Sequence, residues 1–124
     1  MHALTWFEIP ALYLNSAIRF NAPALRNKVR KGTLGNGELM LFDVPFNTGE
    51  AVGGSIAVRA DLKPTTYGPV IHQNAFGILA DAVARIGVAG GTVPVPFLNQ
   101  GKFGFLASFL DSEGNRVGLI SGEK

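Results

Sequence analysis

At 124 residues, the chain is long enough for one domain with a single sizeable hydrophobic core. Hydrophobic residues make up 47% of it and charged residues 16%, a composition typical of a globular protein rather than a disordered one. The formal net charge of +2 is too small to predict a nucleic-acid partner, although it favours anionic over cationic ligands. The chain has no cysteine, which excludes disulfides, thiolate metal sites and cysteine nucleophiles.

Neither a leader nor a membrane span is expected from the hydrophobic pattern. The first residues have no basic region followed by an apolar core, as a secretory signal would. The most apolar long segment, residues 76–91, is too short to cross a bilayer and is interrupted by Asp81 and Arg85. These observations predict a cytoplasmic protein that does not act in a membrane.

The first half of the sequence is expected to place one short helix among strands. A strand is predicted over Leu4–Ile9, and Pro10 ends it. Apolar residues at helical spacing follow, with Asn15 or Ser16 as the N-cap. Pro23 predicts that this helix is short or ends there, because proline lacks the amide that a helix interior requires. Further strands are expected at Lys28–Thr33, Glu38–Val44 and Ser55–Arg59.

The second half repeats this order of elements. A strand over Pro69–Asn74 precedes a helix over Ile78–Val88, and Gly90-Gly91 ends the helix because glycine adopts the left-handed cap without steric cost. Three strands are expected after it, at Thr92–Pro96, Lys102–Leu110 and Arg116–Ser121. The segment His72-Gln73-Asn74 is unusually polar for a buried strand, so at least one polar side chain there needs a partner.

The repeat is also visible in individual residues. Leu14-x-x-Ala17-Ile18 recurs 65 positions later as Leu79-x-x-Ala82-Val83. Two further matches lie at an offset of 64, namely Gly37 with Gly101 and Gly54-Ser55-Ile56 with Gly118-Leu119-Ile120. The pattern predicts a single α+β domain over residues 1–124, built from two βαβββ modules at about 3–59 and 69–121 with a linker at about 60–68.

Two stretches carry a family resemblance. The first is Trp6–Pro10 together with Ser16–Phe20, and the second is the C-terminal stretch Phe103–Leu119. They resemble the opening strand and helix and the closing hairpin of the glyoxalase/bleomycin-resistance/dioxygenase (vicinal oxygen chelate) superfamily. The resemblance extends over nearly the whole chain. It implies that the curved sheets of the two modules form a cup in which a ligand binds, and that the protein is a homodimer.

The resemblance also bears on a metal site. Glyoxalase I-like members bind a divalent metal through four side chains, from the first and last strands of each module. The resemblance places Trp6, Gly54, Ile71 and Gly118 at those positions, and none of these side chains can coordinate a metal. We therefore expect neither a metal nor another cofactor. One extra residue in the connection at 75–77 would instead turn His72 into the cup, but one histidine cannot hold a metal.

Alternation along the first strand selects the candidate cup residues of the first half. Trp6 and Glu8 share one face of the strand, while Phe7 and Ile9 share the other, toward the helix. Glu8 is therefore a candidate general base, because a semi-enclosed carboxylate has a perturbed pKa. The alternatives are a salt bridge or hydrogen bond to a neighbouring strand, or exposure at the rim. The partner of Glu8 in the repeat is predicted to be Gln73, another candidate ligand contact.

Three more candidate ligand contacts come from the second half. His72 has either a structural, hydrogen-bonded role or a contact with the ligand. Phe103 and Phe105 belong to a row of phenylalanines on one strand face, which forms either the core or a wall of the cup.

Three functional interpretations remain open on this basis. The first is a metal-free protein that binds a small molecule, and the positive net charge favours an anionic one. The second is a metal-dependent lyase, isomerase or dioxygenase that uses a relocated metal site. The third is a small-molecule-binding subunit that acts through a protein partner. The absence of ligand side chains at the four family positions favours the first and the third.

Overall fold

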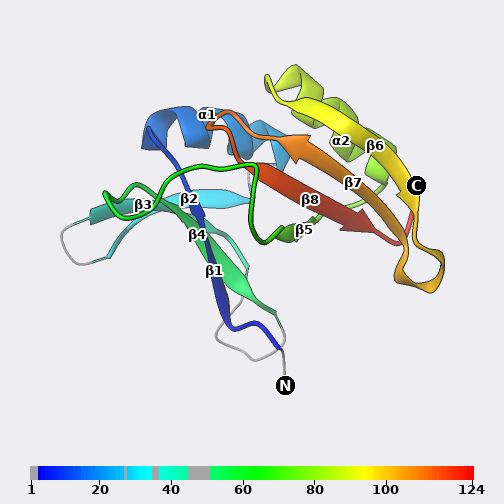
Figure 1. Ribbon diagram of the computed structural model, residues 1–124, viewed down its shortest axis with the longest axis horizontal. Coiled ribbons are helices and arrows are strands. Elements are labelled where there is room, and N and C mark those ends of the chain that lie inside the picture. The colour runs from blue at the N-terminus through cyan, green and yellow to red at the C-terminus, as the bar shows by residue number, and fades with distance from the viewer. Residues whose placement is uncertain (1–2, 27, 35–36, 45–50) are drawn as a thin grey trace.

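The computed structural model describes residues 3–26, 28–34, 37–44 and 51–124 (Figure 1). The first module contains β1 (Trp6–Pro10), α1 (Leu14–Ala24), β2 (Val29–Leu34), β3 (Gly37–Phe42) and β4 (Gly53–Ala57). The second contains β5 (His72–Asn74), α2 (Leu79–Val88), β6 (Thr92–Asn99), a 3₁₀ turn η2 (Gly101–Phe103), β7 (Phe105–Leu110) and β8 (Arg116–Ser121). The predicted α+β class and the two βαβββ modules are confirmed.

Each module forms its own four-stranded mixed sheet, in the order β1-β4-β3-β2 and β5-β8-β7-β6. The first and last strands of each module pair in parallel, and the remaining pairs are antiparallel. Residues 58–71 connect the two sheets. No helix of the described residues is long and apolar enough to cross a membrane.

The elements differ from expectation mainly at their ends. The predicted N-caps, Asn15 and Ser16, are wrong, because α1 begins at Leu14 and has Tyr13 as its N-cap, two residues before Asn15. Pro23 lies in the last turn of α1, where the missing amide coincides with the end of the helix. The strand expected over Lys102–Leu110 begins only at Phe105, after η2. Gly104 lies between the two elements with φ +95°, and a Cβ there would be 2.5 Å from a backbone oxygen of β8.

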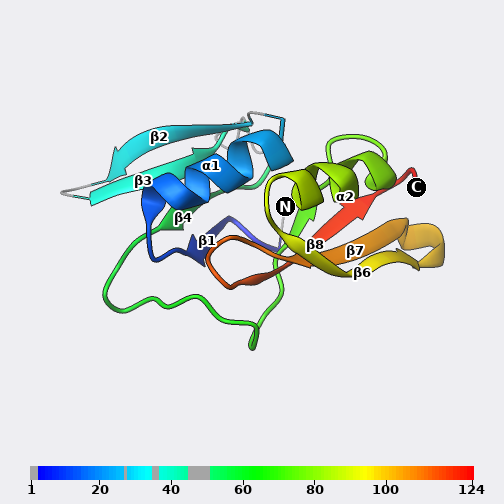
Figure 2. The same cartoon turned by 90° about the horizontal axis from the view of Figure 1, so that it is seen from above.

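Both helices pack on the same side of the molecule and contact each other, as Figure 2 shows. The core of the first module includes Ile9, Ala17, Met40 and Ile56, which pack between α1 and the first sheet. α1 also contributes Phe20 and Ala24 to the core of the second module, where the Phe20 ring lies 6.0 Å from that of Phe109. Helix α1 is therefore shared between the two hydrophobic cores.

A carboxylate from the second module caps the first helix. Glu113, in the turn between β7 and β8, accepts hydrogen bonds from the backbone amides of Leu12 and Tyr13 at 2.9 and 2.8 Å. Its second oxygen accepts a hydrogen bond from Ser16 Oγ at 2.8 Å. Burial alone would raise the pKa of Glu113, but these hydrogen bonds outweigh it and hold the pKa below its usual value. The charge also lies at the positive end of the helix dipole.

The same turn is fixed internally around Asp111 and Asn115. The Asp111 carboxylate accepts the backbone amides of Glu113 and Asn115, and Asn115 Nδ2 donates to Asp111 Oδ2 at 2.9 Å. Asn115 Nδ2 also donates to the carbonyl of Pro10 at 2.7 Å, a second link to the first module. Burial raises the pKa of Asp111 despite these hydrogen bonds, so the turn holds this carboxylate at a desolvation cost.

Arg85 of α2 donates a hydrogen bond to a backbone carbonyl at the opposite end of α1. Its Nε donates to the carbonyl of Ala24 at 3.1 Å and its Nη2 to the carbonyl of Ala75 at 3.0 Å. A cation at this end interacts favourably with the helix dipole. Burial and the neighbouring Arg26 charge lower the pKa of Arg85. Both ends of α1 are thus bound by side chains of the second module.

The cap at Glu113 predicts a pH-dependent loss of stability in Glu113→Gln. At pH 7 the substitution is expected to lower the free energy of unfolding by about 1–2 kcal/mol, because a neutral amide is a weaker acceptor for the backbone amides of Leu12 and Tyr13 just before the helix. The folded pKa of Glu113 is depressed, so its contribution is present above the usual value of about 4.3 and is lost as pH falls through the folded pKa. Urea unfolding at several pH values should therefore show the difference shrinking below about pH 4. Glu123→Gln, an exposed glutamate at the C-terminus, is the control and should be neutral. A Glu113→Gln penalty that is independent of pH would contradict the role of the charge.

Candidate functional site

The two faces of the first sheet are distinguished by what packs against them. Ile9 and Ile56 are buried on the face that α1 covers, and Phe7 packs against the same core. By alternation, Trp6 and Glu8 lie on the opposite face, which is the cup face. The predicted orientation of the first strand is therefore confirmed.

In the second sheet, the side chains of β5 that face the cup are not the ones expected. Gln73 pairs with Leu119, whose side chain belongs to the core beneath α2, while His72 pairs with Gly118. Adjacent residues of a parallel pair point to the same side, so Gln73 faces the helix side and His72 the cup, together with Asn74. The predicted repeat partner of Glu8 is therefore wrong: it is Asn74.

The length of one connection explains this change of face. Eight positions separate Trp6 from Leu14 in the first module, whereas seven separate the equivalent His72 from Leu79 in the second. The connection is one residue shorter, not one longer, and either change turns each side chain of the strand to the other face. Phe76, with φ +54°, and Gly77, with φ +126°, make the tight turn that this shortening requires.

Glu8 is held in an ion pair on the cup face. Arg59 Nη1 lies 2.7 Å from Glu8 Oε1 and 2.9 Å from Oε2, and Arg59 Nε donates to Asp61 at 3.1 Å. The hydrogen bonds to Asp61 and Glu8 raise the pKa of Arg59, and Arg59 in turn lowers the pKa of Asp61. This is the salt bridge that the sequence left open as the alternative to a general base.

The two phenylalanines lie apart from the cup. Phe103 is 68% exposed in η2. Phe105 packs against the α2 core and stacks on Phe97, with ring centroids 5.5 Å apart. The row on β7 therefore forms core, which was one of the two alternatives.

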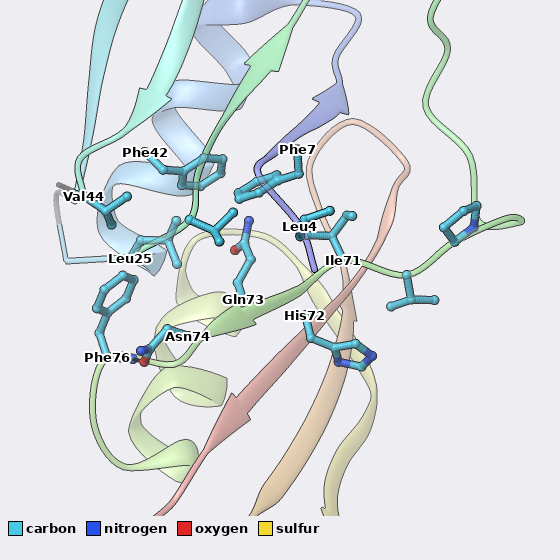
Figure 3. A pocket seen from close by; sticks show the side chains of 13 residues that line it. Leu4, Phe7, Leu25, Phe42, Val44, Ile71, His72, Gln73, Asn74 and Phe76 are labelled. Carbon is cyan, nitrogen blue, oxygen red and sulfur yellow. Dashed lines mark hydrogen bonds between the residues drawn. The ribbon is translucent and has the colours of Figure 1, made fainter. Parts of the chain in front are cut away.

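A cavity of about 540 Å³ lies where the two modules meet (Figure 3). The first module contributes apolar walls, Leu4, Phe7, Leu25, Phe42, Val44 and Val52. The second half contributes Pro69–Asn74 and Phe76. The lining includes Phe7 and Gln73 from the helix side of their sheets, together with His72 and Asn74 from the cup side of β5. Among the predicted ligand contacts, it brings together His72 and Gln73, but not Trp6, Glu8, Phe103 or Phe105.

Among the described polar residues that line this cavity, Gln73 is the buried one. Its side chain is 7% exposed, and its Oε1 accepts no hydrogen bond from the described residues. Figure 3 shows its amide pointing toward Phe7, Phe42 and Leu25, whereas the His72 ring points away from them. A buried carbonyl oxygen without a donor costs free energy that a bound molecule with a donor would recover.

The fold has clear structural relatives. A glyoxalase/bleomycin resistance protein from Albidiferax ferrireducens is 20% identical, with a TM-score of 0.69 over 96% of this chain and 98% of that one. A variant of the fosfomycin resistance protein FosX from Listeria monocytogenes is 14% identical, with a TM-score of 0.65 over 100% and 92%. A glyoxalase I variant from Zea mays is 13% identical, with a TM-score of 0.71 over 98% of this chain and 46% of that one. This chain has the glyoxalase/bleomycin-resistance/dioxygenase fold. No protein-family model and no curated protein sequence matches it.

The four paired cup-facing positions offer few donors for the metal that glyoxalase I-like proteins of this fold bind. The alignment that placed Trp6, Gly54, Ile71 and Gly118 at the metal-ligand positions is wrong at two of them. Ile71 packs against the first core, and Gly54 faces the Phe7 ring on the helix side. The paired cup-facing positions are instead Trp6 with Gly53 and His72 with Gly118, which offer one imidazole as the only donor side chain of the four. Within the described ranges, no three His, Asp or Glu side chains come together as a metal site would require.

Two glycines, one in each sheet, lie beneath an aromatic ring of the neighbouring strand. The two rings lie on opposite faces of their sheets. A Cβ at Gly54 would lie 2.5 Å from three atoms of the Phe7 ring, which packs against Phe42 with ring centroids 5.2 Å apart. A Cβ at Gly118 would collide with Nδ1 of His72, but His72 is exposed and can rotate outward. Each glycine therefore allows a ring to lie flat on the neighbouring strand.

These contacts predict different costs for the two Gly→Ala substitutions. Gly54→Ala is expected to lower the free energy of unfolding by about 1–3 kcal/mol, because the packed Phe7 ring has to shift. Gly118→Ala should cost less than about 1 kcal/mol, because the exposed ring moves instead. Urea denaturation of both variants measures the difference. Equal costs would contradict the assignment of Phe7 and His72 to opposite faces.

Proposed function

We propose that the protein binds a small, largely apolar molecule in the cavity between its two modules, without the metal of glyoxalase I-like members of the fold. The observation that carries the proposal is a cavity of about 540 Å³ whose wall has one buried acceptor without a donor. Ligand pockets have volumes of about 300–1,000 Å³ and combine apolar walls with a few polar groups. The anionic ligand favoured by the net charge receives no support from the described residues of the cavity wall, none of which is lysine or arginine.

The cavity supports binding more than it supports catalysis. Among the described residues, its polar lining consists of His72, Gln73 and Asn74, and the Asn74 side chain already accepts the amide of Phe76 at 2.8 Å. Glu8, the candidate base, lies outside the cavity in its ion pair with Arg59. The homodimer implied by the family resemblance and the cytoplasmic location stay predictions.

Filling the cavity should abolish binding. Val70→Phe and Val52→Phe introduce a ring from two different wall segments, and each is expected to weaken binding of small aromatic molecules at least about tenfold by occupying their space. Val88→Phe, at a 90% exposed position on α2, is the matched control and should leave binding unchanged. The probes are indole, indene and benzofuran, titrated by ligand-observed and ¹⁵N–¹H NMR. If none of the three binds, or if the control weakens binding as much as the cavity variants do, the cavity is not the site.

The protein is also expected to purify without a stoichiometric metal. Elemental analysis after purification without an affinity tag measures the content directly. Thermal unfolding in added zinc, nickel, manganese or iron should change by less than about 1 °C, because a ligand without a site does not stabilise the folded state. One equivalent of metal, or a saturable shift of several degrees with one ion, would favour the metal-dependent enzyme with a relocated site instead.

A further inference from the structure

The side chain of Gln73 has an acceptor that the protein leaves without a donor. Its Oε1 is buried, and the described residues provide no hydrogen bond to it. Its neighbours in the cavity are the apolar side chains of Phe7, Phe42 and Leu25, which have nothing to donate (Figure 3). Glutamine at this position is therefore an unfavourable choice for packing alone, because an apolar side chain of the same size would avoid the desolvation cost.

The nearby polar groups do not supply the missing donor. His72 and Asn74 precede and follow Gln73 on the same strand, so their side chains point to the opposite face. The Asn74 side chain is already engaged by the amide of Phe76. The other buried acceptor without a donor, Ser55 Oγ, lies beside Glu8 on the cup face of the first sheet and belongs to a different surface. Within the described residues no donor remains for Gln73 Oε1. The oxygen has almost no solvent-accessible surface as it lies, so a molecule in the cavity reaches it once the amide turns about its terminal bond.

We propose that the ligand class is an apolar, ring-sized molecule with one N–H or O–H group that donates to Gln73 Oε1. This inference rests on the proposed binding in the cavity and adds its chemical selectivity. The phenyl rings of Phe7, Phe42 and Phe76 provide flat apolar contacts for the body of such a molecule. The single acceptor fixes its orientation, because the ligand's donor pairs there and nowhere else on the apolar walls.

Three probes of nearly the same shape isolate the hydrogen bond. Indole has an N–H donor, benzofuran has an oxygen acceptor in its place, and indene has neither. Indole is expected to bind about tenfold more tightly than the other two, the effect of one hydrogen bond formed in an apolar site. Gln73→Met keeps the length of the side chain but removes the acceptor, so the three probes should bind it with similar affinity. Gln100→Met, the same change at the other glutamine, which is exposed before η2, should keep the preference for indole.

The stability of the variants gives a second measurement. Gln73→Met and Gln73→Leu remove a buried acceptor without a donor, so their melting temperatures are expected to be unchanged or higher than that of the natural chain. A large fall in both would mean that Gln73 has a structural partner, and this would overturn the inference.

The possible outcomes separate the inference from the function on which it rests. Equal affinities for the three probes, all lost in Val70→Phe, would overturn the donor selectivity and leave binding in the cavity intact. A preference for benzofuran would show that the amide presents its N–H group, which also overturns the inference. Failure of all three probes to bind would overturn the proposed function itself.

Discussion

The position of Glu113 at the start of α1 is the constraint on which the arrangement of the two modules depends. Each module has its own sheet, so among the described strands no ladder of backbone hydrogen bonds fixes one module against the other. The link is made instead by α1, which the carboxylate of Glu113 caps at one end and Arg85 binds at the other. Between these two ends Phe20 enters the core of the second module. Because the walls of the cavity come from both modules, its shape follows from how α1 is held.

The order of the elements could be predicted from the sequence because it depends on local patterns. Apolar residues at helical spacing, short strand-like runs and turn-forming glycines fix where helices and strands occur, and all of these formed. The repeat was visible because both modules bury the same helix positions, such as Ala17 and Ala82. The cap on α1 could not be predicted in this way, since Glu113 lies about a hundred residues from the helix that it caps.

The faces of the strands could not be transferred from one module to the other by counting. An offset of 65 aligns the two helices, but the first strands are related by 66, and the last strands by 65 rather than the 64 expected from Gly54 and Gly118. An error of one residue leaves a helix nearly unchanged, whereas in a strand it exchanges the buried and the open face. This is why Gln73 was expected beside Glu8 in the cup and instead lies against the cavity on the helix side. The polarity of His72-Gln73-Asn74 was the one sequence signal that pointed to this strand, although it did not show which residue lacks a partner. The apolar walls of the cavity could not be predicted from the sequence, because Leu4, Val44 and Val52 lie beyond the ends of strands and come together only in the folded chain.

The location of the cavity also gives ligand binding a structural consequence. On the cup face, the paired positions Trp6, Gly53, His72 and Gly118 provide one donor for a metal, and the charge of Glu8 is neutralised by Arg59. At the junction, by contrast, a molecule in the cavity would contact Phe7 and Phe42 of one module and Gln73 of the other at the same time. Any apolar area that it buries therefore stabilises the contact between the modules, at roughly 25 cal/mol for each Å² removed from water. Glu113 and Arg85 hold that contact at the two ends of α1, and an occupant of the cavity would add to it beside Leu25, directly after the same helix. In this arrangement the binding of the ligand and the docking of the modules share one interface, so whatever strengthens one is expected to strengthen the other.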